Sequence, residues 1–361
     1  MKPLSGVRII EFDGLGPVTF AGMVLADLGA EIVRLTRADG AGAFGDVGGA
    51  VLHRGRSAVP VDLKNPADRD RILDLIATAD AVIEGFRPGV LERLGLGPEV
   101  CMARNPRLVV GRITGWGQTG PLSSSVGHDI NYIGLTGALH AMGEPDRPPR
   151  PPLNLVGDYG GGAMLLVVGV LAAVIEARTT GRGRVVDAAM TDGAAMMSSL
   201  FFALTASGLW SGERGANLLD GGAPFYRCYA CADGKFIAVG ALEPRFYAAL
   251  LHGLDIDPAE APQLPMTTWP ALHGRFEALF ATRSRDDWSA RFAGTEACVT
   301  PVLSFQEAAG HPHNQARQTF AGAPVQPAPA PRFDGHVEPV APGTALSLDE
   351  ALARWRQATA D

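Results

Sequence analysis

The stretch VRIIEFDGLGPVTFAGMVLADLGAEIVRL, residues 7–35, decides the fold of this 361-residue chain. Its β-rich run Val7–Phe12 is followed by a Gly-Pro turn, a segment with helical spacing over Ala21–Leu28, and a second β-rich run over Glu31–Leu35. The glycine at position 29 is typical of a residue that ends a helix. The stretch therefore predicts the strand–helix–strand opening of a doubly wound fold.

The same alternation of strand and helix continues along the first half of the chain. Further β-rich runs lie at 58–63, 81–84, 108–113 and 185–188, and helical segments separate them. This repetition predicts a Rossmann-like parallel sheet with helices on both faces. Ligands of such sheets bind beyond the carboxyl ends of the strands, so we expect the functional site there.

The pattern changes after residue 216. A Gly-rich linker, NLLDGGAPFY, leads into a predicted hairpin and then a mainly helical stretch. The apolar helical region before the linker, 192–210, is predicted to be buried in the core or at a subunit interface, and the Pro- and Ala-rich tail is predicted to end in a short helix. We expect a large α/β domain over 1–216, a smaller α+β domain over 217–315, and a C-terminal arm over 316–361 that returns to the large domain.

Composition excludes several classes of function. The net charge of −7 and the pI near 5.6 argue against a general affinity for nucleic acid or for an anionic membrane. No secretory h-region is visible at the N-terminus, and the longest apolar run is too short to span a bilayer. Four scattered cysteines predict a reducing, cytoplasmic compartment. The pair Cys228 and Cys231 lacks a second pair, so we expect no metal.

Arginines are concentrated in the loops that connect the predicted strands. In a chain that is acidic overall, such a concentration predicts a bound polyanion, such as a phosphate-bearing ligand. The opening turn does not fit a dinucleotide fingerprint, because Thr19 stands where Gly or Ala is required. The arginines in question are Arg37, Arg54, Arg56, Arg87 and Arg93.

The most informative stretch for chemistry runs from Gly127 to Gly162. It begins with the pair His128–Asp129 and ends with Asp158 and three glycines, which we interpret as a loop entering a buried helix. Asp158 would then lie near the positive end of that helix, where a carboxylate is held ionised. A histidine and a carboxylate that face one cleft suit proton transfer on both faces of a carbon. On pattern alone, a structural histidine and a helix-capping aspartate are the more usual interpretations of these residue types.

The motifs PLSGVRIIEF, VIEGFRPGVLERLG, TGWGQTGP, GHDINYI, PPLNLVGDYGGG, ANLLDGGAPFY and VGALEPRFY resemble family III of the CoA-transferases. Within that family, the chain is similar to the racemases of 2-methyl-branched acyl-CoA thioesters. The resemblance covers nearly the whole chain. It implies an α/β large domain, a small domain and a homodimer of two interlocked subunits, active in the metabolism of branched-chain fatty acids.

The resemblance also implies roles for individual residues. His128 and Asp158 match the two residues that face the α-carbon of the thioester from opposite sides. Asn154 matches a residue that partners the aspartate, and Glu243 matches a glutamate that supports the histidine from the partner subunit. Backbone N–H groups near His128 and Asp129 are the candidates for holding the enolate oxygen.

No separate cofactor is expected, because CoA is part of the acyl-CoA substrate. Its 3′-phosphate and pyrophosphate are expected to meet a set of arginines. Tyr132 is a candidate for lining the thioester pocket, although a role in packing is equally compatible with the sequence. The arginines of this set are Arg37, Arg54, Arg87 and Arg93.

Other functions are compatible with parts of the pattern. A true CoA-transferase would use Asp158 as a nucleophile that forms a mixed anhydride, with no need for an opposing histidine. A non-catalytic acyl-CoA carrier would keep the arginines but would have no use for His128, Asp158 and Glu243 together. A nicotinamide-dependent dehydrogenase is disfavoured by the failed glycine fingerprint.

Overall fold

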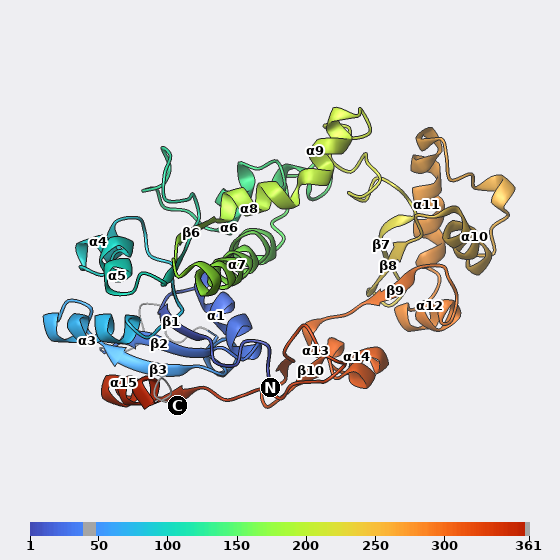
Figure 1. Ribbon diagram of the computed structural model, residues 1–361. Helices are drawn as coiled ribbons and strands as arrows, with labels where there is room; N and C mark the ends of the chain where they lie inside the picture. Colours follow the sequence, from blue (N-terminus) through green and yellow to red (C-terminus); the bar gives the residue numbers. More distant parts are fainter. Residues whose placement is uncertain (39–47, 358–361) are drawn as a thin grey trace. The chain divides into compact units, whose positions relative to one another are not determined.

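The computed structural model describes residues 1–38 and 48–357. They form two compact units, each with its own hydrophobic core (Figure 1). The first unit contains residues 1–138, 152–199 and the C-terminal segment from 316, and the second contains residues 139–151 and 200–315.

A seven-stranded, wholly parallel sheet forms the centre of the first unit. The strand order is β12-β3-β2-β1-β4-β5-β6, so the direction of winding reverses between β1 and β4. This is the point at which doubly wound sheets bind ligands. The predicted fold class is confirmed. The strands are β1 (Arg8–Phe12), β2 (Glu31–Arg37), β3 (Ser57–Val61), β4 (Ala81–Glu84), β5 (Val109–Thr114), β6 (Val185–Ala189) and β12 (Thr344–Ala345).

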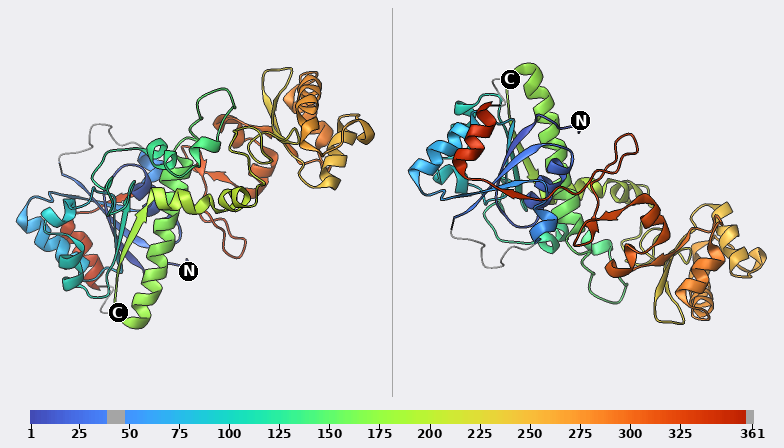
Figure 2. Two further views of the ribbon diagram at one scale, coloured as in Figure 1. Left: turned by 90° about the horizontal axis from the view of Figure 1, so that it is seen from above. Right: turned by 90° about the horizontal axis from the view of Figure 1, so that it is seen from below.

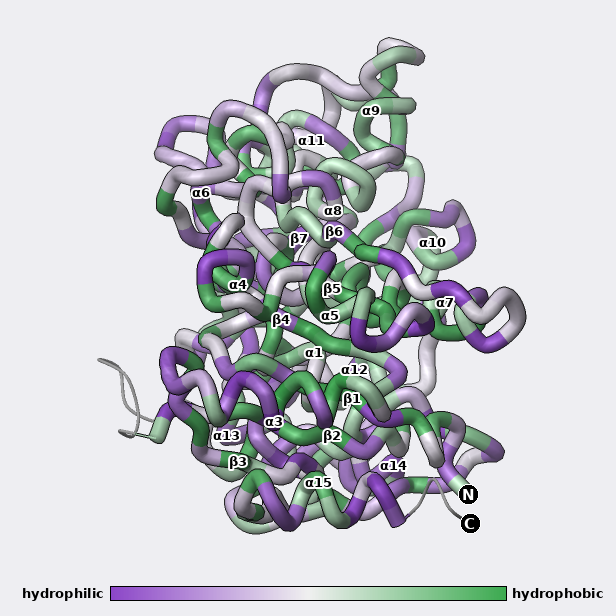
Figure 3. The backbone as a smooth tube through the Cα atoms, turned by 60° about the vertical axis from the view of Figure 1, so that its left-hand side comes forward, coloured by the Kyte–Doolittle hydropathy of each residue, from purple (hydrophilic) through white to green (hydrophobic). Residues whose placement is uncertain are grey.

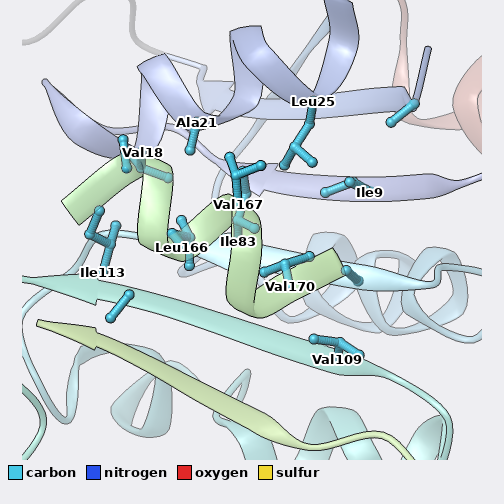
Figure 4. Close-up of a cluster of buried hydrophobic side chains, with 14 of the residues drawn as sticks. Ile9, Val18, Ala21, Leu25, Ile83, Val109, Ile113, Leu166, Val167 and Val170 are labelled. Atoms are coloured by element: carbon cyan, nitrogen blue, oxygen red, sulfur yellow. The ribbon is translucent and has the colours of Figure 1, made fainter. Parts of the chain in front are cut away.

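One face of this sheet is covered by α1 (Pro17–Asp27) and α7 (Leu165–Thr180). Figure 4 shows Leu166 and Val170 of α7 directed at the strands that carry Ile83 and Val109, while Leu25 of α1 points toward the strand that carries Ile9. Such branched side chains fit the pleated surface of buried parallel strands. The sequences of these strands are nearly continuous apolar runs, because both of their faces are covered. The hydrophobic colour along β4 and β5 in Figure 3 marks this buried layer.

The opposite face is covered by α3 (Pro66–Ile76), α5 (Pro98–Arg104) and α15 (Leu348–Gln357). Asn65 begins α3 as predicted: its side chain accepts the N–H of Ala67, and Pro66 occupies the first helical position. The C-terminal segment completes this layer, because β12 pairs with β3 and Trp355 of α15 is fully buried. Figure 2 shows α15, in red, beside the blue helix α3.

The glycine-rich stretch before α7 is helical, so the predicted loop is wrong. Leu155–Met164 forms a π-helical segment, η2, that continues directly into α7. Together they give 26 residues, long and apolar enough by composition to cross a bilayer, which contradicts our expectation about length. Half of the apolar window is buried within the protein, and its inner side belongs to the first core. This burial is what a core helix of a globular domain shows.

Two short helices follow β6, namely α8 (Met190–Met197) and α9 (Ser199–Ala206). The chain's own core does not bury most of this region, and burial at a subunit interface, the other predicted possibility, stays a prediction. No residue of α9 is buried, and Met196 and Phe202 are 56% and 61% exposed. The apolar character of these helices is therefore not used by the chain's own core.

The second unit contains a three-stranded antiparallel sheet, in the order β7-β8-β9. The predicted hairpin is confirmed as β7 (Tyr226–Ala230) and β8 (Phe236–Gly240), and β9 (Val299–Val302) pairs with β8. The helices α10 (Pro244–Gly253), α11 (Trp269–Phe280) and α12 (Arg285–Phe292) pack on this sheet around an aromatic core that includes Phe276 and Phe280.

The bounds of the second unit differ from the domain expected to begin at residue 217. The guanidinium of Arg214 donates hydrogen bonds of 2.7–3.0 Å to the carbonyls of His140, Glu144 and Arg147, which ties residues 139–151 to the start of the linker. The remaining short elements are α2 (Gly49–Leu52), α4 (Val90–Arg93), α6 (Asp129–Gly134), η1 (Leu139–Ala141), η3 (Pro258–Glu260), η4 (Met266–Thr268), α13 (Phe305–Ala308), α14 (Pro312–Arg317), β10 (Phe320–Ala321) and β11 (Gln326–Pro327).

Candidate active site

His128 lies at the N-terminus of α6, at an exposed position of the first unit. Its backbone N–H donates to the side-chain oxygen of Asn131 at 3.0 Å, which fixes the first turn of the helix. Tyr132 holds the preceding loop, because its hydroxyl donates to the carbonyl of Gly127 and its ring packs edge-on against Trp116, 4.9 Å between centroids. These contacts hold the backbone around His128, and we call residues 127–132 together with Trp116 the His128 wall.

Tyr132 is only 9% exposed, and its hydroxyl is already engaged by the chain. The structure favours the packing role that the sequence left open over a place in the thioester pocket. Burial raises the pKa of the Tyr132 hydroxyl, and the Asp158 carboxyl adds to the effect, whereas the charge of Arg87 opposes it. Arg87, which follows β4, therefore acts electrostatically on this wall.

Asp158 lies in the first turn of η2, within the π-helical segment. The wider π-helical turn is visible in the hydrogen bond from Tyr159 N–H to the carbonyl of Asn154, five residues earlier. Tyr159 stacks on Phe20 of α1 with ring centroids 4.2 Å apart. These contacts define the second support, which we call the Asp158 wall.

The consecutive glycines of η2 allow α8 to approach closely. A Cβ added to Gly161 would lie 2.7 Å from the backbone nitrogen of Ala194, and one added to Gly193 of α8 would overlap the carbonyl oxygen of Gly161. The glycines therefore serve close packing between helices. The sequence pattern suggested a loop because consecutive glycines occur both in loops and where two helices pack closely.

The carboxyl of Asp158 is partly buried and has few compensating donors. Asn154 donates its amide N–H to Asp158 Oδ2 at 3.3 Å. Burial raises the pKa of the Asp158 carboxyl; the Asn154 hydrogen bond and the charge of His128 lower it, while the charge of Asp129 raises it. The net effect is a pKa above the ordinary value, because burial outweighs the hydrogen bond and the charge that favour the ionised carboxylate.

Asp129 joins the two walls. It is the first residue of α6, and its Oδ2 accepts the backbone N–H of Asp158 at 2.7 Å. The structure thus brings together His128, Asp129, Asn154 and Asp158 at the carboxyl edge of the sheet. The backbone N–H of His128 is occupied by Asn131, but that of Asp129 has no acceptor among the described residues, which makes it the better candidate for holding an oxyanion.

A cavity of about 510 Å³ lies where β1, β2 and β3 end. Arg37 lines it, as do Lys64 and Phe86. Its volume is in the range of small-molecule sites. Lys64 was not among the candidate cations identified from the sequence. It follows β3 closely and, like the predicted arginines, lies beyond the carboxyl end of a strand. Arg93 is exposed at the end of α4, beside Gly89.

Arg54 is not presented to a ligand. It is 2% exposed, its Nε donates to Asp27 at 3.1 Å, and its Nη1 donates to Gln326 and to the carbonyl of Pro327. It precedes β3 and therefore lies at the amino edge of the sheet, opposite to the ligand edge. Arg56 is likewise buried, in an ion pair with Glu11. Both guanidinium groups are therefore enclosed within the fold and paired with carboxylates of the chain.

Glu243 belongs to the second unit, where it forms the N-cap of α10 without a capping hydrogen bond from its side chain. Its charge acts on the nearby Cys298 thiol, whose pKa is raised mainly by burial. Cys298 lines a cavity of about 670 Å³ on the face of the small sheet, together with Tyr226 and Arg227. The predicted approach of Glu243 to a histidine of a partner subunit stays a prediction.

All four cysteines are free, and Cys228 is exposed whereas Cys231 is buried. Among residues 1–38 and 48–357, no three His, Cys, Asp or Glu side chains are grouped so that they could hold a metal ion.

The family model and similar relatives agree on one protein family. The sequence model of CoA-transferase family III matches residues 4–341. The chain is 45% identical over 332 residues to the alpha-methylacyl-CoA racemase of Mus musculus, which covers 91% of this chain and 86% of that protein, and 42% identical with the same coverage to its Homo sapiens counterpart. A CaiB/BaiF family protein from Brucella suis matches in structure with a TM-score of 0.81 at 24% identity over the whole of both chains, which shows the fold.

Proposed function

The chain belongs to CoA-transferase family III, and we propose that it is an α-methylacyl-CoA racemase, an isomerase that inverts the α-carbon of 2-methyl-branched acyl-CoA thioesters. Two relatives that carry this name share 42–45% of their aligned residues with it. The observation that carries the proposal is the pair of proton-transfer groups, His128 and Asp158, on two walls that Asp129 joins.

The proposed reaction needs one base and one acid at the same carbon. A thioester makes its α-proton more acidic than an ester does, but the barrier to removal stays high. In one direction the Asp158 carboxylate removes the proton while protonated His128 supplies one to the other face, and in the reverse direction the roles exchange. Positioned general acids and bases each contribute about 10²–10⁴ to a rate.

The raised pKa of Asp158 supports this role. A general acid or base is most effective when its pKa lies near the operating pH, and the pKa of an ordinary carboxyl lies well below neutrality. Burial of Asp158 moves its pKa toward neutrality. Because both groups must share one proton in the resting enzyme, the pair titrates as a coupled system.

The negative charge of the enolate has to be stabilised on the thioester oxygen. The free N–H of Asp129 at the start of α6 is the donor that we assign to this oxygen. A preorganised donor of this kind is worth roughly 3–4 kcal/mol in the transition state.

The CoA moiety is proposed to occupy the cavity beside β2 and β3. Arg37 and Lys64 line this cavity, and Arg87 and Arg93 follow the neighbouring strand β4. Four cations at the carboxyl edge suit the three phosphate groups of CoA. Arg54 is excluded from this set because its donors are used within the fold.

We also propose a homodimer in which Glu243 of the partner subunit supports His128. The supporting observations are the exposed position of His128 and the exposed apolar side chains of α8 and α9, such as Met196 and Phe202. Large exposed apolar patches are typical of subunit interfaces. We further propose a cytoplasmic enzyme of branched-chain lipid metabolism. The four free thiols support the compartment, and the proposed substrate class supports the pathway.

The test uses a single enantiomer of a 2-methylacyl-CoA in deuterated water, with no acceptor acid. We expect the purified protein to incorporate deuterium at the α-carbon and to produce the other enantiomer. The competing assignment, a CoA-transferase, predicts no exchange under these conditions and CoA transfer once a free carboxylic acid is added. That second result would contradict the racemase and make Asp158 a nucleophile.

A further inference from the structure

The side chain of Asp129 makes a contact that takes no part in the proposed proton transfer. Its carboxylate is almost fully buried, at 6% exposure of the residue. Oδ2 accepts the N–H of Asp158 at 2.7 Å, whereas Oδ1 is buried and has no hydrogen-bond donor. No Lys, Arg or His side chain of the described residues pairs with it. A buried carboxylate with so little compensation is costly for the fold, so a functional reason is expected.

The contact is built into the backbone on both sides. Asp129 is the first residue of α6, immediately after His128, and the N–H that it accepts belongs to the π-helical segment. Gly157 makes the approach possible, because a Cβ at that position would lie 2.7 Å from Asp129 Oδ2. One carboxylate therefore fixes the main chain of Asp158 relative to the helix that carries His128.

The same contact places a negative charge beside the Asp158 carboxyl. The ionisable groups that act on Asp158 are Asp129 and His128 at the start of α6, and Tyr132 of the same helix also interacts with it. From its own segment Asn154 contributes a hydrogen bond. The helices α1 and α8, which pack against η2, contribute no ionisable side chain that acts on Asp158. Asp129 is thus the one neighbouring charge that opposes ionisation of Asp158.

We propose that Asp129 is a positioning residue with a second effect: it holds Asp158 in the π-helical turn, and its charge keeps the shared proton on the Asp158 side for part of the time. This inference rests on the proposed racemase function. A neighbouring like charge disfavours the ionised form of a carboxyl. The proton is then distributed between His128 and Asp158, and neither direction of the reaction starts from a rare protonation state.

Asp129→Asn separates the two effects, because the amide keeps an acceptor oxygen for the N–H of Asp158 but removes the charge. Without the charge, Asp158 ionises more readily, so the acid limb of the kcat/KM profile should move to lower pH for both enantiomers. Asp129→Ala also removes the acceptor, and we expect a further loss of kcat of about tenfold or more. The matched control is Asp187→Asn: Asp187 also accepts a backbone N–H, that of Gln118 at 2.9 Å, but does not act on Asp158. Its acid limb should stay unchanged.

A readout that does not depend on turnover distinguishes this inference from the proposed function. Carbon-13 NMR of labelled aspartate should show Asp158 titrating at lower pH in Asp129→Asn than in the unaltered protein. An unchanged Asp158 titration, or an unchanged acid limb with a lower plateau, would overturn the inference. If the amide variant does not fold, Asp129→Ser, which also keeps an oxygen and loses the charge, is measured in its place. If the unaltered protein does not racemise, but the titration shifts as stated, the proposed function fails and the electrostatic role of Asp129 stands.

Discussion

The two walls of the candidate site lie at the same edge of one sheet but offer their side chains very different surroundings. His128 is exposed at the start of the six-residue helix α6, and its position depends on Asn131 and on the Tyr132–Trp116 packing. Asp158 is partly buried in a π-helical segment that packs against α1 and α8. One side chain is therefore solvated while the other is desolvated, and the desolvation raises the pKa of the Asp158 carboxyl.

The largest expected effect comes from removing the ionisable group of the buried wall. Asp158→Asn keeps the shape of the side chain but can no longer take up a proton. We expect racemisation to fall by about 10³-fold or more in both directions, since a two-base reaction needs both partners. Chiral analysis of product measures the loss, and an unchanged melting temperature shows that the fold is intact. Retention of more than a tenth of the activity would contradict the role of Asp158.

The packing that supports the Asp158 wall can be disrupted without changing any polar side chain. In Gly193→Ala the new methyl group overlaps the carbonyl oxygen of Gly161, so α8 and η2 must separate. Overpacking of this kind costs about 1–3 kcal/mol in the free energy of unfolding. We expect that loss together with a reduced kcat, measured by chemical denaturation and by racemisation.

The control for this substitution is Gly274→Ala in α11, where a Cβ meets no atom within 4 Å. An alanine in an open helical position should leave stability unchanged or raise it slightly. If the two substitutions have equal effects, close packing of η2 against α8 is not what holds the Asp158 wall.

Much of the fold could be predicted from sequence because the strands and helices alternate clearly. The strand–helix–strand opening and the Asn65–Pro66 helix start follow from local patterns that the structure confirms. The strand order does not follow from such patterns, since β12 comes from the far end of the chain. The helical state of residues 157–162 was missed because it depends on contact with Gly193, about 30 residues later in the sequence.

The site was less predictable than the fold. Arg37 and Arg54 look alike in sequence, yet Arg37 lines a cavity and Arg54 is buried against Asp27. The difference is set by which edge of the sheet each one reaches, and for Arg54 by a partner at position 326. The direction of the Asp158 pKa shift could not be read from sequence either, because a helix N-terminus and burial act in opposite directions and only the structure shows that burial prevails.

The smallest expected effect comes from the one hydrogen bond that favours the ionised form of Asp158. The 3.3 Å hydrogen bond from Asn154 to Oδ2 lowers the pKa of the Asp158 carboxyl. Asn154→Leu removes this bond, so the pKa of Asp158 should rise further. The acid limb of kcat/KM should therefore move to higher pH, opposite in sign to Asp129→Asn, with less than about a tenfold change at the plateau. A pH–rate profile measures the limb, and a shift to lower pH would show that Asn154 does not stabilise the carboxylate.

In the proposed reaction, His128 acts on one face of the α-carbon and Asp158 acts on the other. The most direct test of this assignment measures deuterium incorporation from deuterated water into each enantiomer of a 2-methylacyl-CoA separately, with His128→Ala and with Asp158→Asn. We predict that His128→Ala exchanges the α-proton of one enantiomer only, that Asp158→Asn exchanges only the other, and that neither variant racemises. Loss of exchange for both enantiomers in one variant, with full exchange of both in the other, would mean that a single group does all the proton transfer and would contradict the two-wall account.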